Sequence, residues 1–390
     1  MTGKAANGHF DTHVCLVSQQ ATPNLTPVLD PEFGPARLVM LVTPEMSQRA
    51  QWLESVLRSR THVKVERIEV TDAWDMHGVL EQLIQWIDQQ APDASIALNV
   101  TGGTKPMAMA AQQAFAMAGL AVFYVHPTRD EVQWLEPRLP AFTLNNRLKL
   151  EDYLAAHGWS VLQRPPRRRP PAHLNALTQE LVLGFDERAR SIGLLNGYAQ
   201  ECERMGLLAI TLDSRDADDT RFRATLGDFE RAGACRVEGQ QLHFSDEAAR
   251  FFCKGGWLED YAAEVVATLP ADVGIQDWAA GVQVRSLANN LPGLGGSNEL
   301  DVAILAHNRL HLVECKTRNL GDEGGAAGAL YKLDALTSLG GLNTASLLVS
   351  YRKLAAGERQ RAKDLGIQTC VGSQLANLRG TLIKWIKTRA

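Results

Sequence analysis

The segment SNELDVAILAHNRLHLVECKT, residues 297–317, decides the fold of the C-terminal part of the chain. It holds two apolar stretches, 299–306 and 310–316, with only three residues between them. Parallel strands need a crossover of a dozen or more residues, so these two stretches can pair only as an antiparallel hairpin. The sequence therefore predicts two adjacent strands of one sheet here.

Charged side chains gather on this hairpin. Alternation puts Asp301 on one face of the first strand and Glu314 with Lys316 on one face of the second, so pairing brings Asp301 beside Glu314. Buried like charges repel and lose hydration, and a divalent cation is their natural compensator. Asp301, Glu314 and the backbone carbonyl of Cys315 offer the oxygen ligands that Mg²⁺ prefers, and Lys316 is placed to orient the attacking water. The alternative is an exposed, salt-bridged hairpin edge.

Helices and strands surround the hairpin in a second α/β pattern. A helix over 257–269 precedes it and carries a further carboxylate, Glu259. We expect further elements in this part of the chain: a strand at 281–287, a helix at 326–339, strands at 345–350 and 367–371, and helices at 355–365 and 373–387.

The N-terminal part alternates short buried strands with helices, which is typical of a parallel, doubly wound, Rossmann-like sheet. The expected strands begin at His13 and cover 37–44, 63–70, 95–103 and 120–127, and the expected helices cover 45–58, 77–89 and 106–118. Such sheets bind ligands beyond the carboxyl ends of their strands. TGGTK, residues 101–105, lies at such an end and opens a helix, so its backbone N–H groups favour an anion. It is not a Walker A loop, and a tight turn without a ligand is the alternative.

Length and composition set the broader frame. The 390 residues predict two or three domains, and the net charge of −4 leaves nucleic-acid binding to a local patch. The six cysteines form no C-x-x-C pair, which favours a reducing cytoplasm, and no run of apolar residues is long enough for a membrane span. We expect domains at 1–145, 146–250 and 251–390, the middle one a helical, winged-helix-like linker piece behind a Pro/Arg connector at 163–172. The basic run Arg164, Arg167, Arg168 and Arg169 in the connector is either solvated or in contact with a phosphate backbone.

The segments GGWLEDY, NELDVAIL and HLVECKT resemble the core of PD-(D/E)XK nucleases. The resemblance implies that Glu259, Asp301, Glu314 and Lys316 bind Mg²⁺ or Mn²⁺ and activate water, although the family's Pro-Asp is Leu-Asp here. The segment LYKLDAL is similar to that family's next helix, in which Tyr331 and Lys332 contact substrate or simply pack.

The loop TGGTK and the polar loop 17–27 together resemble CARF domains, and nearly the whole chain is similar to CARF-plus-nuclease ancillary proteins of type III CRISPR systems (the DUF1887-like group). The resemblance implies a homodimer that is activated by a cyclic oligoadenylate, foremost cyclic tetra-adenylate, and that cleaves DNA or RNA. The residues implied to contact the ring are Ser18, Gln19, Thr22, Asn24, Thr101, Gly102, Gly103, Thr104 and Lys105.

Two other functions stay open. One is a ligand-responsive regulator whose middle piece reads DNA while its nuclease fold is inactive, and the other is a constitutive DNA-processing nuclease. The HEPN ribonuclease spacing of Arg168 and His173 is excluded, because Pro170 and Pro171 lie between them and preclude the required helix.

Overall fold

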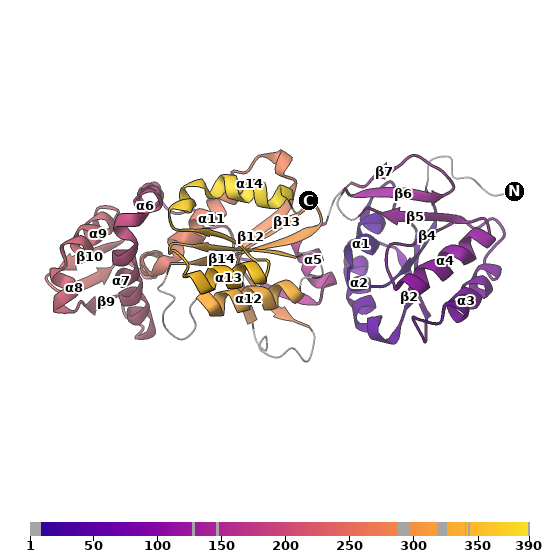
Figure 1. Cartoon of the computed structure of the whole chain (residues 1–390), viewed down its shortest axis with the longest axis horizontal. Helices are drawn as coiled ribbons and strands as arrows, with labels where there is room; N and C mark the ends of the chain where they lie inside the picture. Colours follow the sequence, from indigo (N-terminus) through magenta and orange to yellow (C-terminus); the bar gives the residue numbers. More distant parts are fainter. Residues whose placement is uncertain are drawn as a thin grey trace.

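The computed structural model of the chain describes residues 9–126, 129–145, 148–287, 297–317, 326–339, 341 and 344–388. Three bodies, each with its own β-sheet, follow one another along the longest axis of the molecule (Figure 1). Their order in space differs from their order in the chain. The C-terminal body lies in the centre, with the N-terminal body on one side and the middle segment on the other (Figure 1). The chain must therefore pass along the central body before it enters the middle segment.

The N-terminal sheet has the strand order β3-β2-β1-β4-β5-β6-β7. Its strands are β1 (Thr12–Leu16), β2 (Arg37–Val42), β3 (Lys64–Glu69), β4 (Ile96–Asn99), β5 (Ala121–Val125), β6 (Glu131–Glu136) and β7 (Phe142–Thr143). The first five are parallel, as the sequence predicts, and β6 and β7 add an antiparallel edge. The order reverses between β1 and β4, so the ligand crevice of a doubly wound sheet lies above these two strands.

Helices cover both faces of this sheet. They are α1 (Thr22–Leu29), the 3₁₀ turn η1 (Pro44–Met46), α2 (Ser47–Arg60), α3 (Met76–Asp88) and α4 (Lys105–Met117). One core joins α1 and α2 to the sheet, and a separate core joins α3 and α4 to its other face. Helix α1 corrects our expectation of a polar loop at 17–27. Pro23 stands in its first turn, where a missing N–H is harmless, and Leu25 and Val28 are buried against the sheet.

The middle segment is a winged helix. Its elements are α6 (Ala172–Leu183), α7 (Phe185–Arg204), β9 (Ala209–Thr211), α8 (Ser214–Asp218), α9 (Thr220–Arg231), β10 (Cys235–Glu238), β11 (Gln241–Phe244) and α10 (Glu247–Phe251). A three-stranded sheet of order β10-β11-β9 packs with α7 and α9, and the β10-β11 hairpin is the wing. These elements agree with the helical, winged-helix-like piece that the sequence analysis expects.

The central body holds a mixed sheet of order β16-β15-β14-β13-β12-β8. Its strands are β8 (Trp159–Gln163), β12 (Ile275–Ser286), β13 (Ser297–Ala306), β14 (Arg309–Lys316), β15 (Ala345–Ser350) and β16 (Gln368–Val371). Strand β8 pairs antiparallel with β12. This pairing corrects our placement of 159–163 in the linker piece, because these residues form an edge of the C-terminal sheet.

Helices enclose this sheet as well. They are α5 (Leu150–Ala156), the π-helical turn η2 (Phe252–Gly256), α11 (Trp257–Ala267), η3 (Ala271–Val273), α12 (Ala326–Leu339), α13 (Ala356–Asp364), η4 (Gly372–Asn377) and α14 (Leu378–Thr388). The core on one face contains α11 and α14, and the core on the other contains α5, α12 and α13. None of the helices in the described ranges combines the length and the apolar character that a membrane span requires.

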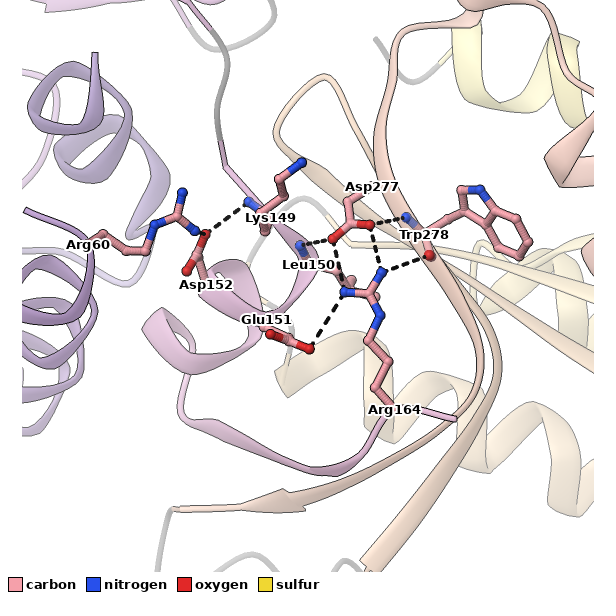
Figure 2. A network of polar contacts seen from close by, with 8 residues as sticks. All are labelled: Arg60, Lys149, Leu150, Glu151, Asp152, Arg164, Asp277 and Trp278. Atoms are coloured by element: carbon pink, nitrogen blue, oxygen red, sulfur yellow. Dashed lines mark hydrogen bonds and ion pairs between the residues drawn. The ribbon is translucent and has the colours of Figure 1, made fainter. Parts of the chain in front are cut away.

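Helix α5 joins the N-terminal body to the central one. Its apolar residues share one core with α1 and α2 on one side and with β12, β13 and α12 on the other. Asp152 of α5 pairs with Arg60 of α2, and Asp277 of β12 accepts a hydrogen bond of 3.0 Å from the backbone N of Leu150 (Figure 2). The two bodies are thus connected by packed side chains and not by a loose tether.

Candidate functional site

The β13-β14 hairpin forms as the sequence predicts. Its turn consists of His307 and Asn308, both with positive φ (50° and 53°), which is the backbone of a type I′ turn. The last recorded pair before the open end of the hairpin is Val302 with Val313, so Asp301 and Glu314 come next to one another. The backbone N of Cys315 donates to Asp301 Oδ2 at 2.7 Å, which fixes the orientation of that carboxylate.

Two lysines converge on Glu314, whose side chain is only 2% exposed. Lys316 Nζ lies 2.6 Å from Glu314 Oε1, and Lys332 Nζ of α12 lies 2.9 Å from Oε2. Lys332, expected from the resemblance as a substrate contact, therefore holds a predicted metal ligand in this structure. Tyr331 is exposed, and the guanidinium carbon of Arg361 lies 5.3 Å from its ring centroid.

Glu259 reaches the site from the other side, at the start of α11. Gly255 has φ of 117°, and a Cβ there would lie 1.9 Å from Thr317 Oγ1. Only glycine permits this close approach, which sets the first turn of α11 against the end of β14. The Gly-Gly pair before Trp257 is thus the local cause of the position of Glu259.

The electrostatics of the three carboxylates show an excess of buried negative charge. Burial and the neighbouring Asp301 raise the pKa of Glu259 to about 8, and burial and Glu314 raise the pKa of Asp301 to about 7. Burial opposes the charge of Lys316, but Glu314 and Asp301 outweigh it and raise the pKa of Lys316 to about 12. Lys316 is therefore a permanent cation near neutral pH and not a general base.

The donor set suits a hard divalent cation. Among the described residues, no three His, Cys, Asp or Glu side chains form a ready-made metal-binding group. The two neighbouring strand carboxylates, Asp301 and Glu314, nevertheless match the manner in which Mg²⁺ binds, through one or two carboxylates with water and phosphate oxygens completing its shell. Asp301 and Glu314 would hold such an ion, with the carbonyl of Cys315 and with Glu259 at its edge.

A pocket of about 370 Å³ lies above β1 and the start of α4. Four of the residues expected to contact the ring line it: Ser18, Gln19, Gly103 and Thr104. Thr104 Oγ1 donates to the carbonyl of Ala73 at 2.8 Å and also accepts from the backbone N of Met107, capping α4. The loop 101–105 therefore lies at the pocket, and the pocket lies where the strand order reverses between β1 and β4.

The other expected ring contacts have different roles in this structure. Asn24 is buried: its Nδ2 donates to Leu16 O at 2.8 Å and its Oδ1 accepts from Asn99. Thr101 Oγ1 donates to Asn99 Oδ1 at 2.6 Å. Gly102 lies so close to Leu16 that a Cβ would be 2.1 Å from the carbonyl oxygen of Leu16. These residues hold the loop in shape. Thr22 is also buried, and Lys105 is exposed at the first turn of α4, beside the pocket lining.

The pocket also contains residues that the sequence analysis missed. Thr43, Glu45 and Met46 follow β2, and Ala73 and Trp74 follow β3. The side chain of Trp74 is 72% exposed. Its backbone N donates a hydrogen bond of 2.8 Å to Asp72 Oδ1. A polar loop after each parallel strand is the signal that locates such residues, since these ends share one edge of the sheet.

Two of the three arginines on α9, the helix that would read DNA, are bound within the winged helix. Arg223 donates to the carbonyls of Ala217 and Gly239, and Arg231 pairs with Asp228. A hollow of about 690 Å³ between β16 and α14 is larger than the pocket described above. Its lining includes Gln368, Asn377 and Lys384 but no carboxylate, so it lacks metal ligands.

Comparison with known proteins finds two families in succession. Residues 12–153 match the family described as the Card1 CARF domain, and residues 246–389 match the family described as the Card1-like endonuclease domain. The solved structure of protein VC1899 from Vibrio cholerae is 26% identical, covers 97% of this chain and 98% of its own, and has a TM-score of 0.85. No curated protein matches the sequence.

Two further solved structures share the fold. Can2 from Sulfobacillus thermosulfidooxidans, in complex with cyclic tetra-adenylate, is 24% identical over 96% of this chain and 99% of its own, with a TM-score of 0.78. A type III CRISPR defence DNA nuclease activated by cyclic oligoadenylate is 22% identical over 89% of this chain and 46% of its own, with a TM-score of 0.54.

Proposed function

This chain is a CARF-domain protein with a Card1-like endonuclease domain, and we propose that it is a metal-dependent nuclease activated by a cyclic oligoadenylate. The observation that carries the proposal is the cluster of Asp301, Glu314 and Lys316 beside Glu259. Burial raises the pKa of Glu259 and of Asp301 beside the charged Lys316, and this supports a site for a divalent cation and a phosphodiester.

The chemistry we propose is hydrolysis of a phosphodiester bond in DNA or RNA. A bound Mg²⁺ or Mn²⁺ would supply Lewis-acid stabilisation of the phosphate and a lowered pKa for bound water. Asp301, oriented by the N–H of Cys315, and Glu314 would hold the ion. Lys316 donates to the attacking water or to a non-bridging phosphate oxygen, where its fixed charge offsets the negative charge that develops.

We propose cyclic tetra-adenylate as the activator and the pocket beside α4 as its site. Can2, which shares the fold over nearly the whole chain, binds this ring, and that supports the assignment. Backbone N–H groups at the start of α4 and the ammonium of Lys105 suit phosphates. The exposed indole of Trp74 suits an adenine, since stacking of a base on an aromatic ring contributes about 1–3 kcal/mol. Two copies facing one symmetric ring would complete the site.

One incubation series tests the proposal. Plasmid DNA, single-stranded DNA and RNA are incubated with the full chain and Mg²⁺ or Mn²⁺, with and without each cyclic oligoadenylate. We expect cleavage of at least one substrate that rises with one ring and is abolished by EDTA. Lys316→Met is the matched control, because it removes the charge and retains the bulk. If no substrate is cut under any of these conditions, or if Lys316→Met cuts as fast as the wild type, the proposal is wrong.

The structure favours the nuclease over a DNA-reading regulator. A regulator requires a recognition helix with cations free to meet phosphates or base edges. Arg223 and Arg231 of α9 are instead bound to backbone carbonyls and to Asp228.

A further inference from the structure

The basic connector between β8 and α6 lies against the nuclease domain and is not a solvated tether. Arg164 Nη2 lies 2.7 Å from Asp277 Oδ1 of β12. Arg167 pairs with Glu264 of α11, and its guanidinium carbon lies 5.6 Å from the ring centroid of Trp278. These two arginines bind the connector to β12 and α11, and Arg168 makes a third contact of this kind.

Arg168 is bound to the nuclease site itself. Its Nη2 lies 3.2 Å from Glu259 Oε2, and its Nε lies 3.2 Å from Asp260 Oδ1. The guanidinium carbon lies 4.0 Å from the ring centroid of Phe251, which gives the cation a third support. Arg168 thus neutralises a carboxylate that the nuclease would turn toward a metal ion.

A guanidinium in this position and a divalent cation in the site disfavour one another. Both are positive, and both are stabilised by the same carboxylates, of which Glu259 is the shared one. The Arg168 side chain is 47% exposed, so its ion pair is weak enough to be exchanged. The site would therefore have two opposed arrangements, one with Arg168 at Glu259, as in this structure, and one with a metal ion bound.

The connector ties Arg168 to the sensor domain. Pro165 and Pro166 separate Arg168 from Arg164, and consecutive prolines hold the chain extended and stiff, so a displacement at one end reaches the other. Arg164 Nη1 lies 3.6 Å from Glu151 Oε1 of α5 (Figure 2).

Helix α5 continues this line into the sensor. Asp152, next to Glu151, accepts from the backbone N of Lys149 at 3.0 Å and pairs with Arg60 of α2 (Figure 2). Helix α2 belongs to the domain that holds the pocket. A movement of α5 relative to the central sheet would therefore act on Arg164 and on the connector.

We propose that Arg168 restrains the nuclease by occupying Glu259, and that α5 and the stiff connector release it when the sensor binds its ligand. This inference rests on the proposed function for its release step. The competition between Arg168 and the metal ion does not depend on any ligand and can be measured by itself.

The first test is Mn²⁺ binding to the full-length protein, measured by calorimetry without nucleic acid or cyclic oligoadenylate. Arg168→Gln keeps much of the side-chain length and removes the charge. We expect it to bind Mn²⁺ about fivefold more tightly than the wild type, because this fold-change corresponds to the free energy of an exposed ion pair. Arg169→Ala is the matched control, since Arg169 is an exposed neighbour without an ion pair in the described part of the chain. Its affinity should equal that of the wild type. Unchanged or weaker Mn²⁺ binding in Arg168→Gln overturns the proposal.

The second test is cleavage in the absence of the activator. Arg168→Gln should cut without cyclic tetra-adenylate at a rate several-fold above the wild type, while Arg169→Ala stays at the wild-type rate. A variant that loses activated cleavage and gains none without ligand would show Arg168 to be a positioning residue, and would overturn the restraint. If the wild type itself cuts nothing with ligand and Mn²⁺, the proposed function fails, and the Mn²⁺ affinities still decide the competition.

Discussion

Replacing Asp301 by Asn should stabilise the protein without metal and destabilise it relative to the wild type with metal. The pKa of Asp301 rises from 3.8 to about 7 on folding, because of burial and of Glu314. At about 1.36 kcal/mol per pKa unit this corresponds to about 4 kcal/mol of folding free energy lost above pH 7. Asn keeps an oxygen that can accept from the N–H of Cys315, so the local geometry is retained.

The sign of the pH dependence follows from the raised pKa. The folded state favours protonated Asp301, so ionising Asp301 lowers the free energy of unfolding. This loss of stability is absent below the unfolded pKa near 4 and complete above the folded pKa near 7. In EDTA at pH 8, the free energy of unfolding of Asp301→Asn should therefore exceed that of the wild type by about 2–4 kcal/mol. The advantage should shrink to about 1–2 kcal/mol at pH 5.

Urea unfolding of both proteins at pH 5 and pH 8, with EDTA or with Mn²⁺, measures these differences. With Mn²⁺ the order should reverse, because the wild type gains binding energy that Asp301→Asn has lost. An Asp301→Asn protein that is less stable than the wild type in EDTA at pH 8 would refute the charge-repulsion argument. A stability difference that is the same at both pH values would refute it as well.

Three further predictions concern other parts of the molecule. Lys316→Met should lower the activated cleavage rate by about 10²–10³ and change Mn²⁺ affinity by only a few-fold, measured by single-turnover cleavage and calorimetry. Lys105→Ala and Trp74→Ala should each weaken binding of cyclic tetra-adenylate by about ten- to a hundredfold, while Trp74→Phe restores most of the affinity; equal calorimetric affinities would remove the pocket from consideration. His13 is buried between Phe33 and Phe123, and burial lowers its pKa to about 3, so stability is lost as the pH falls below 6.5. In urea unfolding, the stability of His13→Phe relative to the wild type should rise by about 2 kcal/mol when the pH is lowered from 8 to 5. No such rise would contradict this account.

Strands β13 and β14 were predictable because their signal is local. A three-residue separation within 297–317 forces an antiparallel hairpin, and alternation then selects the face that carries Asp301 and Glu314. The loop 101–105 was predictable for the same reason, since a buried strand, two glycines and a helix start follow one another directly. By contrast, α1 was missed, because two prolines in an eight-residue segment weaken the helical pattern. Its helical state depends on Leu25 and Val28 being buried against the sheet.

The sequence by itself determined the two α/β domains, the β13-β14 hairpin and the loop 101–105, because hydrophobic periodicity and turn residues act over a few positions. Only the tertiary structure decided that the nuclease lies between the sensor and the winged helix, that β8 joins the nuclease sheet, and that Arg168 binds Glu259. Arg168 and Glu259 are separated by a whole winged-helix segment of chain. Nothing local specifies such a pair, because it forms only when packing of α5, β8 and α11 brings the connector to the site.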